Sequence, residues 1–390
     1  MEARRERLEK AERIMMNFAH QTGIVGCRKP KRYLWTDAFA VCNFLGLYLR
    51  KNEEKYKQLA LKLVDQVHFI LGRHREDDSR RGWISGLSDE EGLKHPTLGG
   101  LRIGKKLPER KPDEPFDEIL EWERDGQYYH YLTRWMHALN RVSQITGDVT
   151  YNLWAIELAK TTHKAFVYET PWGRKRIYWK MSIDLSRPLV ASMGQHDPLD
   201  GFVTYNEIQA AAPVDPSWPN LAREIEEIEE ICNEINWVTS DPLAIGGLLW
   251  NGYFLARLIA SKHLRRMDLL LETLNASLLG LELYLASGGI KLPATRRLAF
   301  RELGLSIGFK AVEELRRLIA SKPEAFSEEV SPLVESLIAY ARLAGEIERF
   351  WLNPTNRENV LWREHEDINM VMLATSLIPD GFLGVKFPSE

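Results

Sequence analysis

Acidic residues recur at the points where helical stretches of this 390-residue chain are predicted to begin. Two carboxyl groups with different roles can cleave a glycosidic bond: one protonates the leaving oxygen, and the other activates water or attacks directly. At the start of a helix, the unpaired N–H groups and the helix dipole favour the ionised form of a carboxyl group. The candidate catalytic carboxylates are Asp37, Asp125, Asp197, Asp200 and Glu366.

Each of these carboxylates also has a structural interpretation. Asp and Thr just before a helix are common N-caps, and Asp37 follows a threonine. Asp125 precedes a glycine, and Asp197 and Asp200 flank a proline and a glycine, a composition typical of turns. With Gln195 and His196, however, the last two form a denser polar cluster than a turn requires. We therefore predict that at least one member of this cluster is functional.

Three histidines lie beside these acids and provide a different chemistry. His365 is followed by Glu366 and Asp367, and a neighbouring carboxylate raises the basicity of an imidazole. His130 lies one turn into a predicted helix, and His196 belongs to the polar cluster described above. Histidines so placed could remove and return a proton, as a sugar epimerase requires. The alternative for each is a hydrogen-bonded structural histidine.

Tryptophans accompany the acids and suggest a carbohydrate ligand. Trp35, Trp122 and Trp362 stand two to five residues from candidate acids. An indole has an apolar face and a polar N–H, so it suits a partly hydrated surface, and a sugar ring can stack its C–H side on the indole face. We predict that these three contact substrate, together with Gln127, His130, His196 and Asp367. The alternative is that the tryptophans cover the helical core.

The elements that must position these residues are helices. Apolar residues from 128 to 142 recur with a helical period, and Thr146-Gly147 is a typical C-terminal stop. Asp241-Pro242 is a cap followed by a first-turn proline. The predicted hairpins pair residues 36–49 with 53–71, 128–142 with 149–167, 201–211 with 218–236, 241–261 with 263–286, 296–320 with 326–350, and 366–377 with 2–19.

Six antiparallel hairpins that close into a ring would place the N-termini of all six first helices at one mouth. The fold predicted is therefore all-α: an (α/α)6 toroid, forming a single domain over residues 1–390. Two long insertions, at about 74–126 and 168–200, precede first-helix N-termini and are predicted to form a rim and a lid. Residues 176–183 within the second insertion read as a short strand or hairpin arm.

Composition excludes several other classes. A net charge of -3 and a pI near 6.4 give no reason to expect nucleic acid. Three cysteines without metal-ligand spacing, a charged N-terminus and no apolar run approaching ~20 residues favour a reduced, cytoplasmic protein without a membrane segment. No HExxH, CxxC, phosphate-loop or dinucleotide motif is present, so neither a metal nor another cofactor is expected. The oligomeric state is left open.

Three segments, 33–37, 122–139 and 362–377, resemble the six-hairpin glycosidase superfamily of (α/α)6 toroids. That group includes unsaturated glucuronyl hydrolases, many inverting glycosidases and the N-acylglucosamine 2-epimerase family. The resemblance implies a pocket at the N-terminal ends of the inner helices. It also implies an Asp or Glu pair for a hydrolase, or paired histidines for an epimerase, with His365 where the second would lie.

The expected function is therefore that of a carbohydrate-active enzyme acting on a small-molecule or oligosaccharide substrate. A glycoside hydrolase with a carboxylate pair is the first hypothesis. A sugar epimerase or isomerase using histidine acid–base chemistry is the alternative, as is a non-catalytic toroid that binds a sugar or a protein.

Overall fold

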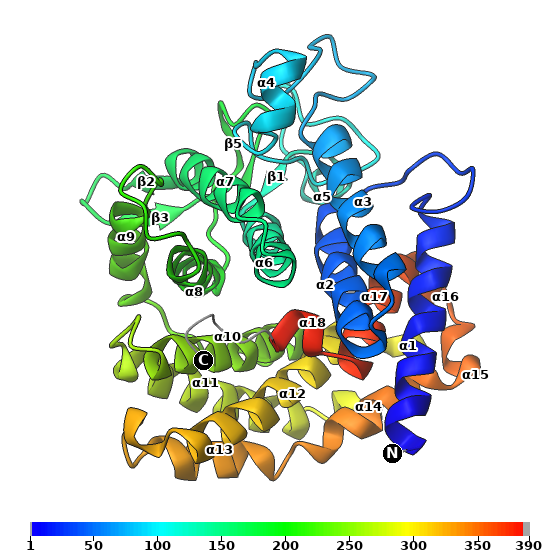
Figure 1. Ribbon diagram of the computed structural model, residues 1–390, viewed down its shortest axis with the longest axis vertical. Helices are drawn as coiled ribbons and strands as arrows, with labels where there is room; N and C mark the ends of the chain where they lie inside the picture. Colours follow the sequence, from blue (N-terminus) through cyan, green and yellow to red (C-terminus); the bar gives the residue numbers. More distant parts are fainter. Residues whose placement is uncertain (1, 385–390) are drawn as a thin grey trace. The chain divides into compact units, whose positions relative to one another are not determined.

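The computed structural model describes residues 2–384, and these are predominantly helical (Figure 1). The strands described are short and form one three-stranded and one two-stranded sheet. The all-α prediction is confirmed. Closure of the helical hairpins into a ring stays a prediction.

Backbone packing divides the chain into two compact units. Unit 1 comprises residues 1–18, 49–52 and 236–390, and unit 2 comprises residues 19–48 and 53–235. Two helices, α1 (Glu2–Gln21) and α2 (Leu34–Lys51), contribute residues to both units. That residues 1–390 form one domain stays a prediction.

Unit 2 contains the hairpins predicted in the first half of the chain. α6 packs against α7 and α8, and α8 packs against α9. α6 ends at Gly147, which adopts the left-handed conformation (φ 77°) expected of a C-terminal glycine. The last helix is shorter than the predicted 218–236, because residues 215–218 form a turn capped by the Asp215 side chain. The helices are α3 (Glu54–Leu71), α6 (Tyr129–Thr146), α7 (Thr150–Phe166), α8 (Asp197–Ala210) and α9 (Ala222–Cys232).

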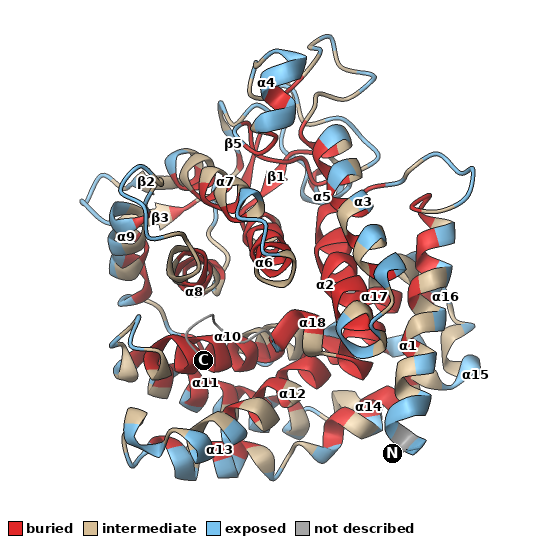
Figure 2. Cartoon of the chain, in the orientation of Figure 1, coloured by how far each residue is buried: buried red, intermediate tan, exposed pale blue. Residues whose placement is uncertain are grey.

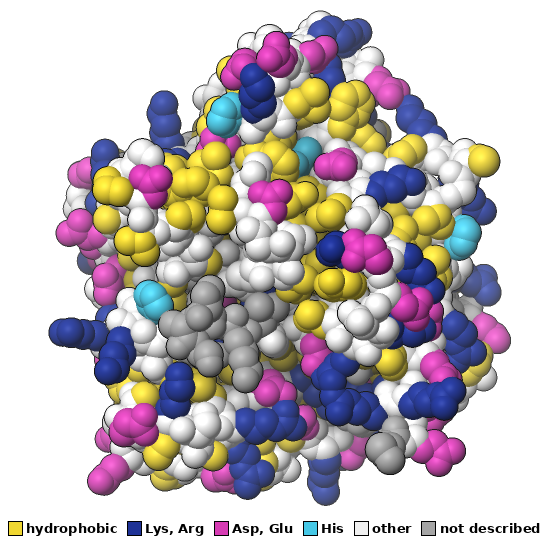
Figure 3. All heavy atoms as spheres, in the orientation of Figure 1, with side chains coloured by type: hydrophobic (Ala, Val, Ile, Leu, Met, Phe, Trp, Pro, Cys, Tyr) yellow, Lys and Arg dark blue, Asp and Glu magenta, His cyan; other side chains and the backbone are white. Residues whose placement is uncertain are grey.

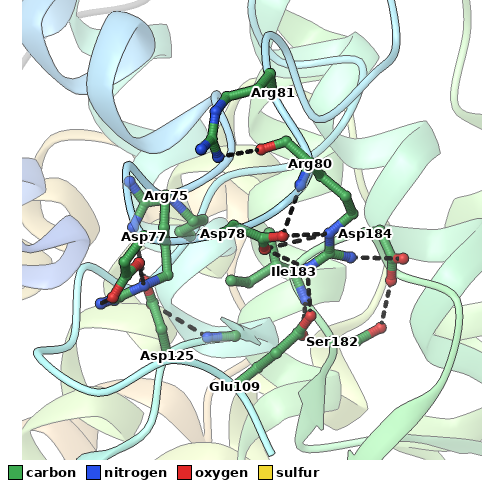
Figure 4. A network of polar contacts seen from close by, with 12 residues as sticks. Arg75, Asp77, Asp78, Arg80, Arg81, Glu109, Asp125, Ser182, Ile183 and Asp184 are labelled. Atoms are coloured by element: carbon green, nitrogen blue, oxygen red, sulfur yellow. Dashed lines mark hydrogen bonds and ion pairs between the residues drawn. The ribbon is translucent and has the colours of Figure 1, made fainter. Parts of the chain in front are cut away.

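Both insertions belong to unit 2 and are ordered by polar contacts. The first holds two short helices, and the second holds the predicted hairpin arm, where β3 pairs with β2 and β4 with β1 and β5. Arg80 joins the insertions, because its guanidinium binds Asp78 and Glu109 of the first and Asp184 of the second (Figure 4). The elements are α4 (Asp89–Lys94), α5 (Glu118–Glu123), β1 (Gln127–Tyr128), β2 (Val167–Glu169), β3 (Lys175–Ile177), β4 (Lys180–Met181) and β5 (Pro188–Val190).

Unit 1 is built around α12, which packs against α10, α13, α14 and α17. α10 and α12 approach closely at Gly246, where an added Cβ would lie 2.2 Å from the carbonyl oxygen of Gly304. Asp241 caps α10 as predicted, since its Oδ1 accepts a hydrogen bond from Ala244 N at 3.0 Å. The α-helices that start in this unit are α10 (Pro242–Ala260), α11 (Met267–Ala286), α12 (Ala299–Ser321), α13 (Val330–Ile338), α14 (Arg342–Leu352), α15 (Pro354–Arg357), α16 (Val360–Glu364), α17 (Glu366–Leu377) and α18 (Asp380–Leu383).

One sequence prediction for a helix of unit 1 was wrong. The single helix expected over 326–350 is interrupted by a turn at 339–341, and it starts later because Pro332 lies in the first turn of α13, where a missing N–H costs nothing.

Apolar stretches near membrane-spanning length also exist. α10 and α11 have the length and hydropathy to cross a bilayer, but 78% and 50% of their apolar windows are buried within the protein. Core helices have the same composition.

Buried residues line several helices on nearly every side. In α6 and α10 the buried set includes polar residues such as Arg134, Asn140 and Asn251, in addition to the apolar stripe (Figure 2). A buried polar group is stable only when it is hydrogen-bonded or paired. These helices therefore carry polar side chains into the interior, where functional groups can be held in fixed positions.

Candidate functional site

The N-terminal ends of three helices of unit 2 meet. The ring of His130, from the first turn of α6, lies 6.0 Å from the ring of Trp35 on α2. Its Nδ1 atom lies 3.8 Å from Oδ1 of Asp197, the first residue of α8. A similar meeting occurs in unit 1, where Phe300 of α12 contacts His365, the N-cap of α17. In unit 2, these helix starts bring together three of the residues predicted from the sequence, Trp35, His130 and Asp197.

Asp197 is the least compensated of the predicted carboxylates. Its side chain is 8% exposed, and among the described residues Oδ2 has no hydrogen-bond partner. Burial, with a smaller contribution from the negative charge of Asp200, raises the pKa of Asp197 to about 8. The carboxyl group is therefore largely protonated at neutral pH. Gly194 lies against it, and a Cβ there would come within 2.5 Å of Oδ2.

His130 shows the opposite shift. Burial lowers its pKa to about 4, so the imidazole is neutral at neutral pH, although 24% of the side chain stays exposed. The Nε1–H of Trp179 donates to His130 Nδ1 at 3.3 Å. Because an indole N–H can only donate, Nδ1 is the unprotonated nitrogen of the neutral ring and Nε2 carries the proton. Asp197 and His130 thus present a proton donor and a proton acceptor side by side.

Aromatic rings surround this pair. His130 stacks with Tyr128 at 5.4 Å between centroids and contacts Tyr131 edge-on at 4.8 Å. Trp179 is 5.1 Å from Trp122, which is 45% exposed. The aromatic cluster consists of Tyr33, Trp35, Trp122, Tyr128, Tyr131 and Trp179. Several of these rings are only partly buried, as a surface for an amphipathic ligand requires.

Trp35 adds an unsatisfied donor to the cluster. It is 6% exposed, and its Nε1–H has no hydrogen-bond partner among residues 2–384. Leaving such a donor unpaired costs roughly 1–3 kcal/mol. Together, Trp35 Nε1 and Asp197 Oδ2 are one donor and one acidic oxygen that a hydroxylated ligand could satisfy.

Two other predicted carboxylates, Asp200 and Asp37, lie beside arginines. Asp200 pairs with the buried Arg134, and Asp37 lies 3.7 Å from Arg32 while accepting a hydrogen bond from Tyr33 N at 2.9 Å. A guanidinium group compensates the charge of a carboxylate through charge-assisted hydrogen bonds. Asp37 and Asp200 thus lie near the aromatic cluster as neutralised carboxylates.

Asp125 is the most completely bonded of the candidates. It is fully buried, and Oδ2 accepts hydrogen bonds from Arg102 at 2.6 Å and Arg75 at 3.3 Å, while Oδ1 accepts one from Gly104 N at 2.9 Å (Figure 4). These partners all come from the first insertion. The contacts suit an anchor that fixes the insertion to the start of α6.

Gln127 has a similar set of contacts. Its Oε1 accepts from Leu101 N at 2.8 Å, and its Nε2 donates to Gly99 O at 3.0 Å and to Ile183 O at 2.7 Å. The side chain is fully buried and joins both insertions. Its amide oxygen and nitrogen are therefore engaged by backbone groups rather than available to a ligand.

Replacing Asp125 should reveal a structural role. In Asp125→Asn the buried Arg102 loses its counter-charge, and we expect the free energy of unfolding to fall by about 3 kcal/mol. Urea denaturation followed by circular dichroism measures this change. We expect turnover per folded molecule to be retained. A collapse of turnover at unchanged stability would instead support the catalytic role predicted from the sequence.

Two side chains missed by the sequence reasoning complete the site. Trp179 lies in the segment predicted only as a strand, and the buried Lys180 that follows it donates to Glu121 Oε1 at 2.9 Å and to Arg124 O at 2.9 Å. These contacts fix Trp179 against the first insertion. The adjacent Trp-Lys pair in an otherwise apolar strand pattern was the available signal.

The remaining candidates belong to unit 1, apart from His196, which is partly exposed at the N-cap position of α8. Trp362 and Glu366 line a pocket of about 800 Å³ formed entirely within unit 1. His365 and Asp367 are partly exposed at the start of α17. Among the described residues, no group of three or more His, Cys, Asp or Glu side chains could hold a metal ion.

Comparisons with known proteins give little further information. No family model matches the chain, and no curated protein matches it. A crystal structure described as a sugar epimerase from a ruminal bacterium is similar over 88% of this chain and 87% of its own, with 11% sequence identity and a TM-score of 0.46.

Proposed function

We propose that the protein is a carbohydrate-active enzyme that moves a proton on a sugar, as an isomerase or epimerase does, with Asp197 and His130 as its acid–base pair. The observation that carries this proposal is the buried Asp197 carboxyl group, whose Oδ1 atom lies 3.8 Å from Nδ1 of His130. Their pKa values lie on opposite sides of neutrality, at about 8 for Asp197 and about 4 for His130. Groups whose environments separate their pKa values are suited to complementary acid and base roles.

The proposed reaction begins with both groups neutral. His130 Nδ1 removes the proton from the carbon next to the sugar carbonyl, while the Asp197 carboxyl donates its proton to the carbonyl oxygen. The C–H bond breaks, an N–H and an O–H bond form, and the sugar becomes a neutral enediol. Return of the proton from His130 to the neighbouring carbon of the enediol, with transfer of the hydroxyl proton on the original carbon to Asp197, completes an isomerisation. An epimerisation requires the enediol to turn over in the site, so that His130 returns the proton to the opposite face of the original carbon while the hydroxyl group that Asp197 protonated gives its proton back.

The reaction also leaves an imidazolium beside a carboxylate. At ~4 Å and an effective dielectric constant of about 20, two such charges attract by roughly 4 kcal/mol. This attraction exists only after proton transfer, so it stabilises the intermediate and not the resting state. Because the two groups are so close, they act from one side of the substrate, which favours transfer between adjacent atoms.

Trp179 has a positioning role in this scheme. Its hydrogen bond to Nδ1 favours the neutral form of the His130 ring and must break when the substrate binds, because Nδ1 then accepts the substrate's proton. In Trp179→Phe the pKa of His130 should therefore rise, and the acidic limb of the pH dependence of kcat/KM should move to higher pH. An NMR titration of His130 measures the same shift. Trp172→Phe, an 85% exposed residue of the same insertion, is the matched control; equal titration curves for both variants would contradict this role.

Glycoside hydrolysis is the second candidate. A carboxyl group with a raised pKa is also what a general acid needs, and the charge of Asp200 contributes to raising the pKa of Asp197. In a hydrolase, Asp200 would activate water or attack the sugar. Its pairing with Arg134 neutralises it, which is why we place this reaction second.

A panel of aldoses, ketoses and glycosides incubated with the protein in deuterated water distinguishes the two reactions. Isomerisation or epimerisation predicts deuterium at the carbon next to the carbonyl and a product of unchanged mass apart from the exchange. Hydrolysis predicts cleaved glycosides with no deuterium bound to carbon. Deuterium-free cleavage that depends on Asp197 and Asp200 would overturn the isomerase proposal.

A further inference from the structure

Unit 1 holds a pocket of about 800 Å³ that the acid–base site does not use. It lies between the middle of α1 and the segment from α14 to α17, and all its lining residues belong to unit 1. Four of them are cationic: Lys10, Arg13, Arg357 and Arg363. Lys and Arg side chains are also numerous on the face of unit 1 drawn in Figure 3, over α1 and α14.

These cations are poorly compensated. Lys10 pairs with Glu6 on its own helix, but Arg13, Arg357 and Arg363 have no carboxylate within ion-pair distance among the described residues. Natural proteins usually neutralise clustered arginines, because uncompensated like charges repel. Three unpaired guanidinium groups facing one pocket indicate an anion that is supplied from outside.

Arg357 is the most informative of the three. It is partly buried, its Nε donates to the carbonyl oxygen of Trp351, and its guanidinium carbon lies 5.2 Å from the ring centroid of Trp362. Burial lowers the pKa of Arg357, which means that its charge is partly desolvated. A desolvated guanidinium held against an indole face is a rigid, planar donor that suits bidentate binding of an oxyanion.

Two carboxylates, Glu358 and Glu366, also line the pocket. Counting these against the four cations leaves two net positive charges, which still favour an anion. Carboxylates of this kind can accept hydrogen bonds from hydroxyl groups. The lining therefore offers donors to an anionic group and acceptors to hydroxyls of the same ligand.

We propose that this pocket binds a small hydroxylated molecule that carries a phosphate or carboxylate group, with Arg13, Arg357 and Arg363 on the anionic group and Glu358 and Glu366 on its hydroxyls. The site is assigned independently of the acid–base reaction, since no residue of the Asp197–His130 pair takes part. Glu366 and Trp362, predicted from the sequence to act in catalysis and substrate binding, are reassigned to this pocket.

Isothermal titration calorimetry of the full chain with glucose 6-phosphate, glucuronate, inorganic phosphate and glucose tests the proposal. We expect the two anionic sugars to bind saturably, more weakly as salt is added, and glucose to show no such salt-dependent binding. Comparing the affinities of glucose 6-phosphate and glucuronate shows whether the pocket prefers a phosphate or a carboxylate group. In the doubly substituted Arg13→Gln/Arg363→Gln protein, binding should weaken by about tenfold or more.

Two further variants sharpen the result. Arg265→Gln removes an exposed arginine of the same unit that does not line the pocket, and it should leave binding unchanged. Glu366→Gln removes a like charge and should tighten binding of inorganic phosphate. Absence of saturable binding, or equal binding by the double variant and by Arg265→Gln, overturns the proposal. Asp197→Asn should bind the anionic sugars normally, so failure of the acid–base proposal is recognised separately.

Discussion

Asp197→Asn is expected to lower kcat for sugar isomerisation or epimerisation by about 10²- to 10⁴-fold, with little change in KM. An amide has nearly the shape of a carboxyl group but cannot give up a proton to the carbonyl oxygen. His130→Asn should cause a loss of similar size, because it removes the nitrogen that accepts the proton. Steady-state kinetics on the substrate found in the panel, with folding checked by circular dichroism, measures both effects.

The double variant and a matched histidine provide the controls. Since the two groups act as one proton-transferring unit, the combined variant should be hardly slower than either single variant. His163→Asn is the control, because His163 also lies beside a carboxylate, Glu227 at 3.1 Å, but on α7 and outside the aromatic cluster. Full turnover by both single variants, or losses that multiply in the double variant, would contradict the proposed pair.

The second large effect expected for Asp197→Asn is on the pH dependence of stability. The pKa of Asp197 is about 8 in the folded protein, above the value of ~3.9 for an unfolded chain. Between these values the folded protein binds a proton that the unfolded chain has lost, so stability falls as pH rises. Below the lower value both states are protonated, and above the higher value both are ionised. The contribution from this group reaches at most about 6 kcal/mol across the window.

Removing the carboxyl group removes this decrease of the free energy of unfolding with rising pH. Asp197→Asn should therefore be more stable than the natural sequence near pH 8, by a few kcal/mol, and the difference should shrink towards pH 4. Urea denaturation at several pH values between these limits measures it. Asp113→Asn, an exposed carboxylate of the same unit, should leave the slope unchanged. Parallel curves for the natural sequence and Asp197→Asn would show that the carboxyl is ionised in the folded protein.

The two effects have a common origin. A carboxyl group that is buried without a counter-ion destabilises the fold, and the same burial makes it a proton donor at neutral pH. Asp125, by contrast, is buried with Arg102 and Arg75 and stabilises the first insertion. Active sites commonly retain such destabilising groups, so replacing them can raise stability while activity is lost. The contrast between these two aspartates is the strongest reason to place the chemistry at Asp197.

The sequence by itself determined the helical architecture and several of the positions at which helices begin or end. The period of apolar residues located α6, Gly147 marked the end of α6, and Asp241-Pro242 marked the start of α10. These signals are local, because they depend on backbone conformation and on side chains within a few residues. The same local reasoning put His130 and Asp197 at helix starts, which is why both were among the candidates.

The tertiary structure alone decided which candidates differ chemically. Asp125, Asp197 and Asp200 look alike in the sequence. In the structure, Arg102 and Arg134 pair with Asp125 and Asp200 from distant positions, and Oδ2 of Asp197 has no hydrogen-bond partner among the described residues. Whether a carboxyl is ionised depends on its burial and on the charges around it, and neither is encoded within a few residues. The placing of Trp179 against His130, which fixes the imidazole proton, likewise exists only once the second insertion has folded onto the start of α6.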